Sequence, residues 1–181
     1  PNPPAAVLIV VGDGTSGDLA GVLDTGFGNS INVDTLNFSN NEGMVFVNGD
    51  TLTIGSGVSG GVVVSTTSLG AGLTKAGLGT LALVPSSPNN ISTFVGTTAV
   101  TAGALLVNAP LSPSPLGNTT TIGTALIVAN GASLELAGNT TLTLPKITLT
   151  LAGAGVNGLG ALQNLSGFNT LQVCSATMSA N

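Results

Sequence analysis

Side chains that could carry out chemistry are scarce in this chain of 181 residues, and histidine is absent. Without an imidazole, neither a Ser-His-Asp triad nor a Cys-His pair can form, and the chain lacks a common zinc ligand. The remaining candidates for acid–base chemistry are seven carboxylates: Asp13, Asp18, Asp24, Asp34, Glu42, Asp50 and Glu135. Two carboxylates could in principle hydrolyse a glycosidic bond. A lyase would need a basic residue near bound Ca²⁺, but the only cations are Lys75 and Lys146. We therefore expect no enzyme, no catalytic residue and no cofactor.

The segment from Gly12 to Asp18, with Asp24 beyond it, could offer oxygen ligands to Ca²⁺. It lacks both the residue order of an EF-hand and the Gly-Gly-x-Gly-x-Asp repeat of calcium-binding coils. Asp and Gly in such a run more commonly shape turns through hydrogen bonds from side chain to backbone. We expect turns here and no metal.

Lys75 lies among apolar residues, so we expect it to extend toward solvent or to bond carbonyl groups at a corner of the fold, not to bind a ligand. Cys174 is the only cysteine and cannot form an internal disulfide. We expect a small buried core residue there, the alternative being a bridge between molecules.

Threonine pairs of the form Thr-x-Thr occur at Thr51/Thr53, Thr141/Thr143 and Thr148/Thr150. Flat threonine ladders can bind ice, but these pairs fall on scattered coils, and we expect an ordinary solvated face. Five Asn-x-Ser/Thr sequons begin at Asn37, Asn90, Asn118, Asn139 and Asn164; they matter only in a host that glycosylates.

The composition excludes several binding functions. Charged residues are 5% of the chain and the net charge is −5, so there is no basic surface for nucleic acid or an anionic membrane. The mean hydropathy is high, +0.57. Nevertheless, the longest candidate apolar stretch, Ala5–Val11, is far shorter than the roughly 18–20 residues of a spanning helix. We expect no membrane insertion.

Short apolar segments, each closed by Gly, Asn, Asp or Pro, recur along the chain, and several alternate with polar residues at period two, as strands with one buried face do. They are residues 36–38, 45–47, 52–54, 62–64, 81–83, 105–107, 126–128, 134–136, 142–144 and 147–151. No window has a helical period, so we expect almost no helix.

Such spacing fits a β-sandwich or a β-solenoid, and three features favour the solenoid. The strands are very short, the separators are rich in Gly and Asn, and aromatic residues are few. The Pro-rich segments 85–88 and 110–115 interrupt the pattern without ending it and indicate loops. We predict an all-β fold, a parallel β-helix forming a single domain over 1–181, with a β-sandwich as the alternative.

The run Leu73-Thr74-Lys75-Ala76-Gly77-Leu78-Gly79-Thr80-Leu81-Ala82-Leu83 resembles the core of the autotransporter-associated β-strand repeat. Residues 93–98, 102–107, 116–117 and 130–136 resemble the segments that follow it in that family, so the best match spans 73–136. Phe94 stands where the family usually has Tyr. The resemblance implies a right-handed parallel β-helix (β-solenoid) passenger of a large secreted or surface protein and implies no catalytic residue. We also expect Gly77 and Gly79 to lie at corners closed to a side chain.

These observations predict a structural segment or subunit of a bacterial extracellular or surface fibre. Apolar strands near both ends, residues 7–11 and 171–173, lack a polar capping repeat, so we expect head-to-tail association of copies. The alternative is an adhesin that binds glycan or another cell through a projecting loop such as Asn108–Asn118.

Overall fold

The structure, a computed structural model, describes residues 7–10, 19–39, 41–55, 63–64, 70–85, 92–110, 115–117 and 124–180. The run Gly12–Asp18, where we expected turns and no metal, and the sequons at Asn90 and Asn118 lie outside the described residues.

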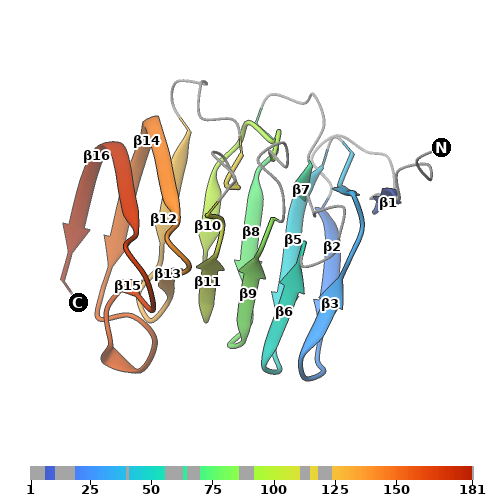
Figure 1. Cartoon of the computed structure of the whole chain (residues 1–181), viewed down its shortest axis with the longest axis horizontal. Helices are drawn as coiled ribbons and strands as arrows, with labels where there is room; N and C mark the ends of the chain where they lie inside the picture. Colours follow the sequence, from blue (N-terminus) through green and yellow to red (C-terminus); the bar gives the residue numbers. More distant parts are fainter. Residues whose placement is uncertain are drawn as a thin grey trace.

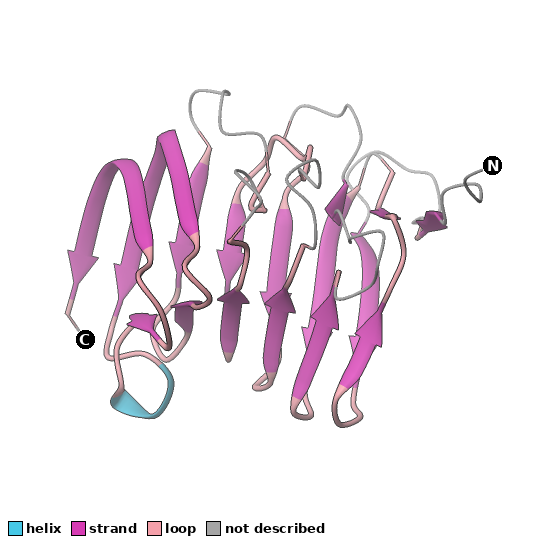
Figure 2. Ribbon diagram, viewed as in Figure 1, coloured by secondary structure: helices cyan, strands magenta, loops and turns pink. Residues whose placement is uncertain are grey.

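Strands dominate the described residues (Figure 2). They are β1 (Val7–Ile9), β2 (Leu19–Asp24), β3 (Asn29–Ile31), β4 (Thr35–Asn37), β5 (Glu42–Val47), β6 (Thr51–Ile54), β7 (Val63–Val64), β8 (Leu73–Ala76), β9 (Thr80–Leu83), β10 (Thr98–Val100), β11 (Ala104–Val107), β12 (Ala125–Val128), β13 (Ser133–Leu136), β14 (Thr141–Ala152), β15 (Leu162–Asn164) and β16 (Thr170–Ser179). The only helical element in the described part of the chain is a short 3₁₀ turn, η1 (Val156–Gly158).

The strands form sheets in which every neighbouring pair is parallel. The largest sheet has the order β16-β14-β12-β10-β8-β5-β2, the second β15-β13-β11-β9-β6-β3, and a short third sheet β1-β4-β7. Coils therefore stack in chain order, and the two termini lie at opposite ends of the stack (Figure 1). This confirms the predicted parallel β-solenoid. It excludes the β-sandwich, whose sheets are antiparallel.

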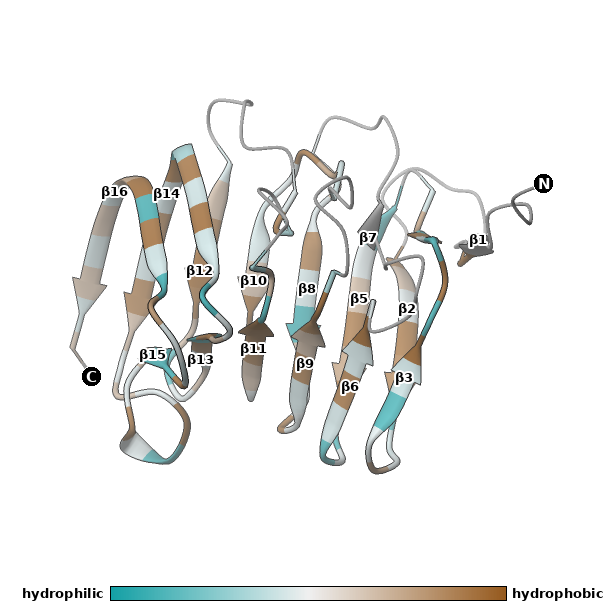
Figure 3. Ribbon diagram, viewed as in Figure 1, coloured by the Kyte–Doolittle hydropathy of each residue, from teal (hydrophilic) through white to brown (hydrophobic). Residues whose placement is uncertain are grey.

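Period-two alternation decides which residues enter the core. In β14, for example, Leu142, Leu144, Leu149 and Leu151 are buried, while Thr143 and Thr150 between them are more exposed. The colour bands along this strand show the same alternation (Figure 3). Because successive coils keep their register, apolar residues stack into columns along the stack, and each column is buried by the coils on either side.

Proline is accommodated differently from the prediction in one place. We expected residues 142–144 and 147–151 to form separate strands, but β14 runs through Pro145. The register with β16 shifts between Leu144 and Thr148, so the residue that cannot donate to the ladder sits in a bulge.

At the corner between β8 and β9, the positions of Gly77 and Gly79 are closed to a side chain, as predicted. Gly77 has φ +78°, and a Cβ there would collide with the carbonyl oxygen of Val47 on the preceding coil. A Cβ on Gly79 would lie 2.7 Å from the Asp50 carbonyl oxygen. The glycines thus let consecutive corners approach closely.

Candidate functional site

Lys75 is fully buried, at 0% exposure, because it occupies an inward position of β8. In register it lies between Val45 and Val100, within a column of otherwise apolar side chains. Its Nζ donates to three carbonyl oxygens: Ala76 at 2.9 Å, Gly77 at 2.8 Å and Ala102 at 3.0 Å. All three donors of an ammonium group therefore have partners. This confirms the expectation that Lys75 bonds corner carbonyls.

Burial of Lys75 lowers the pKa of its ammonium group from 10.5 to about 8. Desolvation disfavours the charged form, and none of the three hydrogen-bond partners is a carboxylate that could offset it. The ammonium ties the β8–β9 corner to the corner of the next coil through Ala102. This geometry indicates a structural role for Lys75, which holds two neighbouring corners together.

Asp24 ends β2 facing inward and is only 6% exposed. Its Oδ1 accepts hydrogen bonds from the Gly26 amide at 3.0 Å and the Asn29 side-chain amide at 2.6 Å. These bonds shape the β2–β3 turn, which is the role we expected for this aspartate. Its Oδ2 is buried without a hydrogen-bond partner.

The carboxylates in the described part of the chain form no cluster of three or more side chains. In the described part of the chain, no three acidic or cysteine side chains come close enough to share a metal ion. Glu42 spans two coils by accepting from the Gly72 amide at 2.7 Å and the Thr74 hydroxyl at 2.9 Å. Glu135 projects between Leu106 and Gln163, and partial burial raises the pKa of its carboxyl group.

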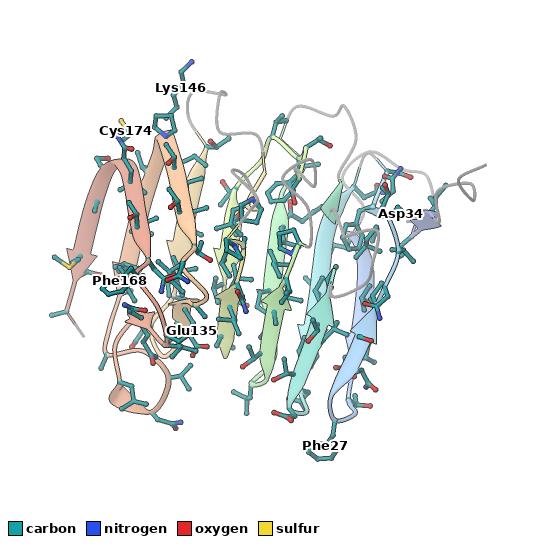
Figure 4. The ribbon with its side chains drawn as sticks, viewed as in Figure 1. Phe27, Asp34, Glu135, Lys146, Phe168 and Cys174 are labelled. Carbon is teal, nitrogen blue, oxygen red and sulfur yellow. The ribbon has the colours of Figure 1, made fainter. Side chains whose placement is uncertain are left out.

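The prediction for Cys174 was wrong, since its side chain is exposed. Leu171 and Val173 pack against the core, so the period-two alternation turns Cys174 outward. It lies opposite the β14 bulge that carries exposed Lys146, and the two side chains mark the same corner (Figure 4).

The threonine pairs are less scattered than we predicted. Thr141/Thr143 and Thr148/Thr150 share β14, and their register partners in β16 include Thr170, Ser175 and Thr177. On the next strand of the sheet, however, Ala125 and Ile127 take the places of Thr148 and Thr150. The hydroxyl rows therefore cover two strands only, which fits the solvated face we expected.

Three of the predicted sequon asparagines lie in described segments, and each takes part in local hydrogen bonds. Asn37 accepts from the Ser39 amide, Asn139 from the Phe168 amide, and Asn164 donates to the Gly167 carbonyl. Their side chains hold turns and corners of the solenoid.

Exposed large apolar side chains concentrate near the two ends of the stack. Among the described residues, those in the first two coils are Ile9, Leu19, Leu23, Phe27 and Phe46, and those near the other end are Leu159, Leu162, Leu165, Phe168 and Met178. In the described segments between the two ends, the exposed large apolar side chains are Leu78 and Ile127. Phe27 and Phe168 mark opposite ends of the molecule in Figure 4.

The strands at these ends are edges. β2 and β3 end their sheets on one side, and β16 and β15 on the other, with no further strand partner among the described residues. Val22 and Ile31 at one end, and Leu171 and Val173 at the other, face the core but are only partly buried. We call these two surfaces the head (β2–β3) and the tail (β15–β16). Sequence reasoning anticipated apolar strands near both ends but missed β2, β3 and β15, which contribute most of these surfaces.

No protein-family model, curated protein or solved structure matches this chain. Among the described residues, no helix has the length and apolar character needed to cross a bilayer.

Proposed function

We propose that this chain is a structural segment of a bacterial extracellular or cell-surface fibre, and that its copies associate end to end. The observation that carries the proposal is the pair of edges, head and tail, at opposite ends of one parallel stack (Figure 1). In the described part of the chain, no further strand lies beside either edge, and each edge has a partly covered slice of core. Another copy can cover both by continuing the ladder.

The extracellular setting is supported by the resemblance of residues 73–83 to the autotransporter-associated repeat. A surface of Ser, Thr, Asn and Gly with few charges is consistent with a part that gives length and stiffness. The side chains with unusual environments stabilise the solenoid itself. Lys75 joins two corners, Asp24 holds the β2–β3 turn, and Glu42 joins two neighbouring coils.

The adhesin alternative relies on the loop Asn108–Asn118. Its described residues, 108–110 and 115–117, largely support the coil: the Ala109 amide donates to Thr140 Oγ1 at 2.7 Å, and Leu116 is buried. The Pro115 carbonyl likewise accepts from the Ser92 hydroxyl at 2.8 Å. We therefore rank the structural role first.

Sedimentation velocity and electron microscopy of the isolated chain test this proposal. A head-to-tail contact that does not close a ring produces indefinite filaments, so we expect filaments whose length grows with concentration. Val173→Lys should abolish them, because it places a cation in the tail contact. Gln172→Lys, one position away on the exposed face of β16, should leave them intact.

Added salt should not dissolve the filaments, because surface charges are already screened within about 8 Å at physiological ionic strength. A chain that stays monomeric at high concentration would refute end-to-end association. It would leave the alternative that further coils of a longer chain cover these edges.

A further inference from the structure

The inward columns of the largest sheet would continue across a junction between two copies. One column runs Ala20, Gly43, Leu73, Thr98, Leu126, Leu149, Ala176, and the next runs Val22, Val45, Lys75, Val100, Val128, Leu151, Met178. If β16 of one copy is placed in parallel register beside β2 of the next, Ala176 meets Ala20 and Met178 meets Val22. A small residue then stacks on a small one, and a large apolar residue on another.

The charge distribution disfavours a contact between two heads. Residues 1–74 carry six acids (Asp13, Asp18, Asp24, Asp34, Glu42 and Asp50) and no Lys or Arg, a formal charge of −6. Residues 75–181 carry Lys75, Lys146 and Glu135, a formal charge of +1, and the two parts together give the net charge of −5. A contact between two heads would bring the acidic N-terminal parts of two copies together, whereas the tail strands β15 and β16 carry no charged side chain. Such charges favour one orientation more than they add affinity.

Pairing of two tails would break the pattern seen in every sheet. A two-fold contact between two β16 edges must be antiparallel, while every neighbouring pair in the described sheets is parallel. It would also place Cys174 of one copy close to Cys174 of the other, because this residue lies near the middle of Thr170–Ser179. The only cysteine of the chain can therefore report on the orientation.

From these three observations we propose that the junction is polar and has a defined register. β16 of one copy pairs in parallel with β2 of the next, with Met178 beside Val22 and Ala176 beside Ala20. This inference rests on the proposed end-to-end association and adds its direction and the residues in contact.

Two variants that each block one end test the direction. Met178→Lys disables the tail and leaves the head intact, and the side chain is 81% exposed, so the fold should tolerate the change. Val22→Lys disables the head and leaves the tail intact. Each variant alone should be monomeric where the wild type forms filaments. An equimolar mixture should form heterodimers of twice the monomer mass and nothing longer, because one free head meets one free tail.

Matched controls carry the same charge on the same strands but on the outer face. Thr177→Lys and Leu23→Lys should both still form filaments, since both side chains are exposed and point away from the junction. Circular dichroism should show the same β-sheet signal in all four variants.

The outcomes separate the direction from the association itself. Filaments in the wild type, combined with a mixture that stays monomeric, would overturn the polar junction and leave end-to-end association standing. Val22→Lys dimers that a short bis-maleimide links through Cys174 would show tail-to-tail pairing and overturn it as well. A monomeric wild type would overturn both proposals.

Discussion

The interior coils, residues 73–136, and the two terminal surfaces are built from the same kinds of residues but differ in what covers them. Leu105 in the interior has register neighbours on both sides, Leu81 and Leu134, and is fully buried. Met178 in the tail has the inward register of Leu151 yet is 81% exposed. Burial in this fold is therefore a property of the neighbouring coil more than of the residue itself, as nearest-neighbour models of repeat proteins require.

Corner glycines of the solenoid differ in how closely the neighbouring coil approaches them. The β8–β9 corner is packed so closely that a methyl group does not fit at Gly77, whereas Gly131, at the β12–β13 corner, has open space around it. At the β8–β9 corner, Lys75 and Gly77 contact the coils on either side.

The largest expected loss of stability comes from adding one methyl group at the β8–β9 corner. Gly77 and Gly131 have nearly the same φ, +78° and +80°. Both Gly→Ala variants should lose about 1–2 kcal/mol to backbone strain. Gly77→Ala should lose a further ~1–3 kcal/mol, because its Cβ collides with the Val47 carbonyl oxygen. Chemical denaturation of the two variants measures the difference, and equal losses would show that the corners are not in tight contact.

Truncating one side chain in the interior and one at the tail tests the main comparison directly. Leu105→Ala should lower the free energy of unfolding by about 2–5 kcal/mol, because it leaves a cavity between two coils. Met178→Ala should change it by less than about 0.5 kcal/mol in dilute monomeric protein. A large loss at Met178 would mean that the tail is covered in solution, and its dependence on protein concentration would identify a second copy as the cover.

The stability should also depend on pH through Lys75. Its pKa is about 8 in the folded chain and 10.5 in the unfolded chain, so between these values the unfolded chain binds more protons. Stability should therefore be lowest and flat below pH 8 and rise by up to about 3 kcal/mol as the pH approaches 10.5. With no His or Tyr in the sequence, few other groups titrate in this window. Urea titrations of the wild type and Lys75→Met check this, and a rise that persists in Lys75→Met would assign it to another group.

Much of the architecture could be predicted from the sequence, because short apolar segments, Gly/Asn separators and period-two alternation are local signals. The apolar segments at 45–47, 81–83, 105–107 and 134–136 all lie in strands. β2, β3 and β15 were missed because Gly21, Asn29 and Asn164 weaken their apolar pattern. These strands exist through pairing with the next or preceding coil, which no local window contains.

The burial of a side chain could be predicted from the alternation along its strand, but not from its residue type. Cys174 was expected in the core because cysteine is commonly buried. Alternation from Leu171 and Val173 would have placed it outside, as the structure does. Two features depend on the stacking of distant segments: the Asp24 Oδ2 without a partner, and the column that runs from Val22 to Met178. No sequence spacing specifies them.

The smallest expected effect, one without any change in stability, contrasts the two lysines under trypsin. Lys75 is fully buried in an interior coil, whereas Lys146 is exposed in the β14 bulge close to the tail. Cleavage at Lys75 requires the coil to open, so its rate should follow the free energy of unfolding, while Lys146 requires only local movement at the bulge. Brief digestion of the native chain should give fragments 1–146 and 147–181 by mass spectrometry, with no cut after residue 75. The Lys146→Gln variant should then resist trypsin almost completely under native conditions. It should become sensitive at Lys75 only in urea concentrations that begin to unfold the chain. Early cutting at Lys75 in the native protein would show that the interior coils open as readily as the tail and would remove the distinction between them.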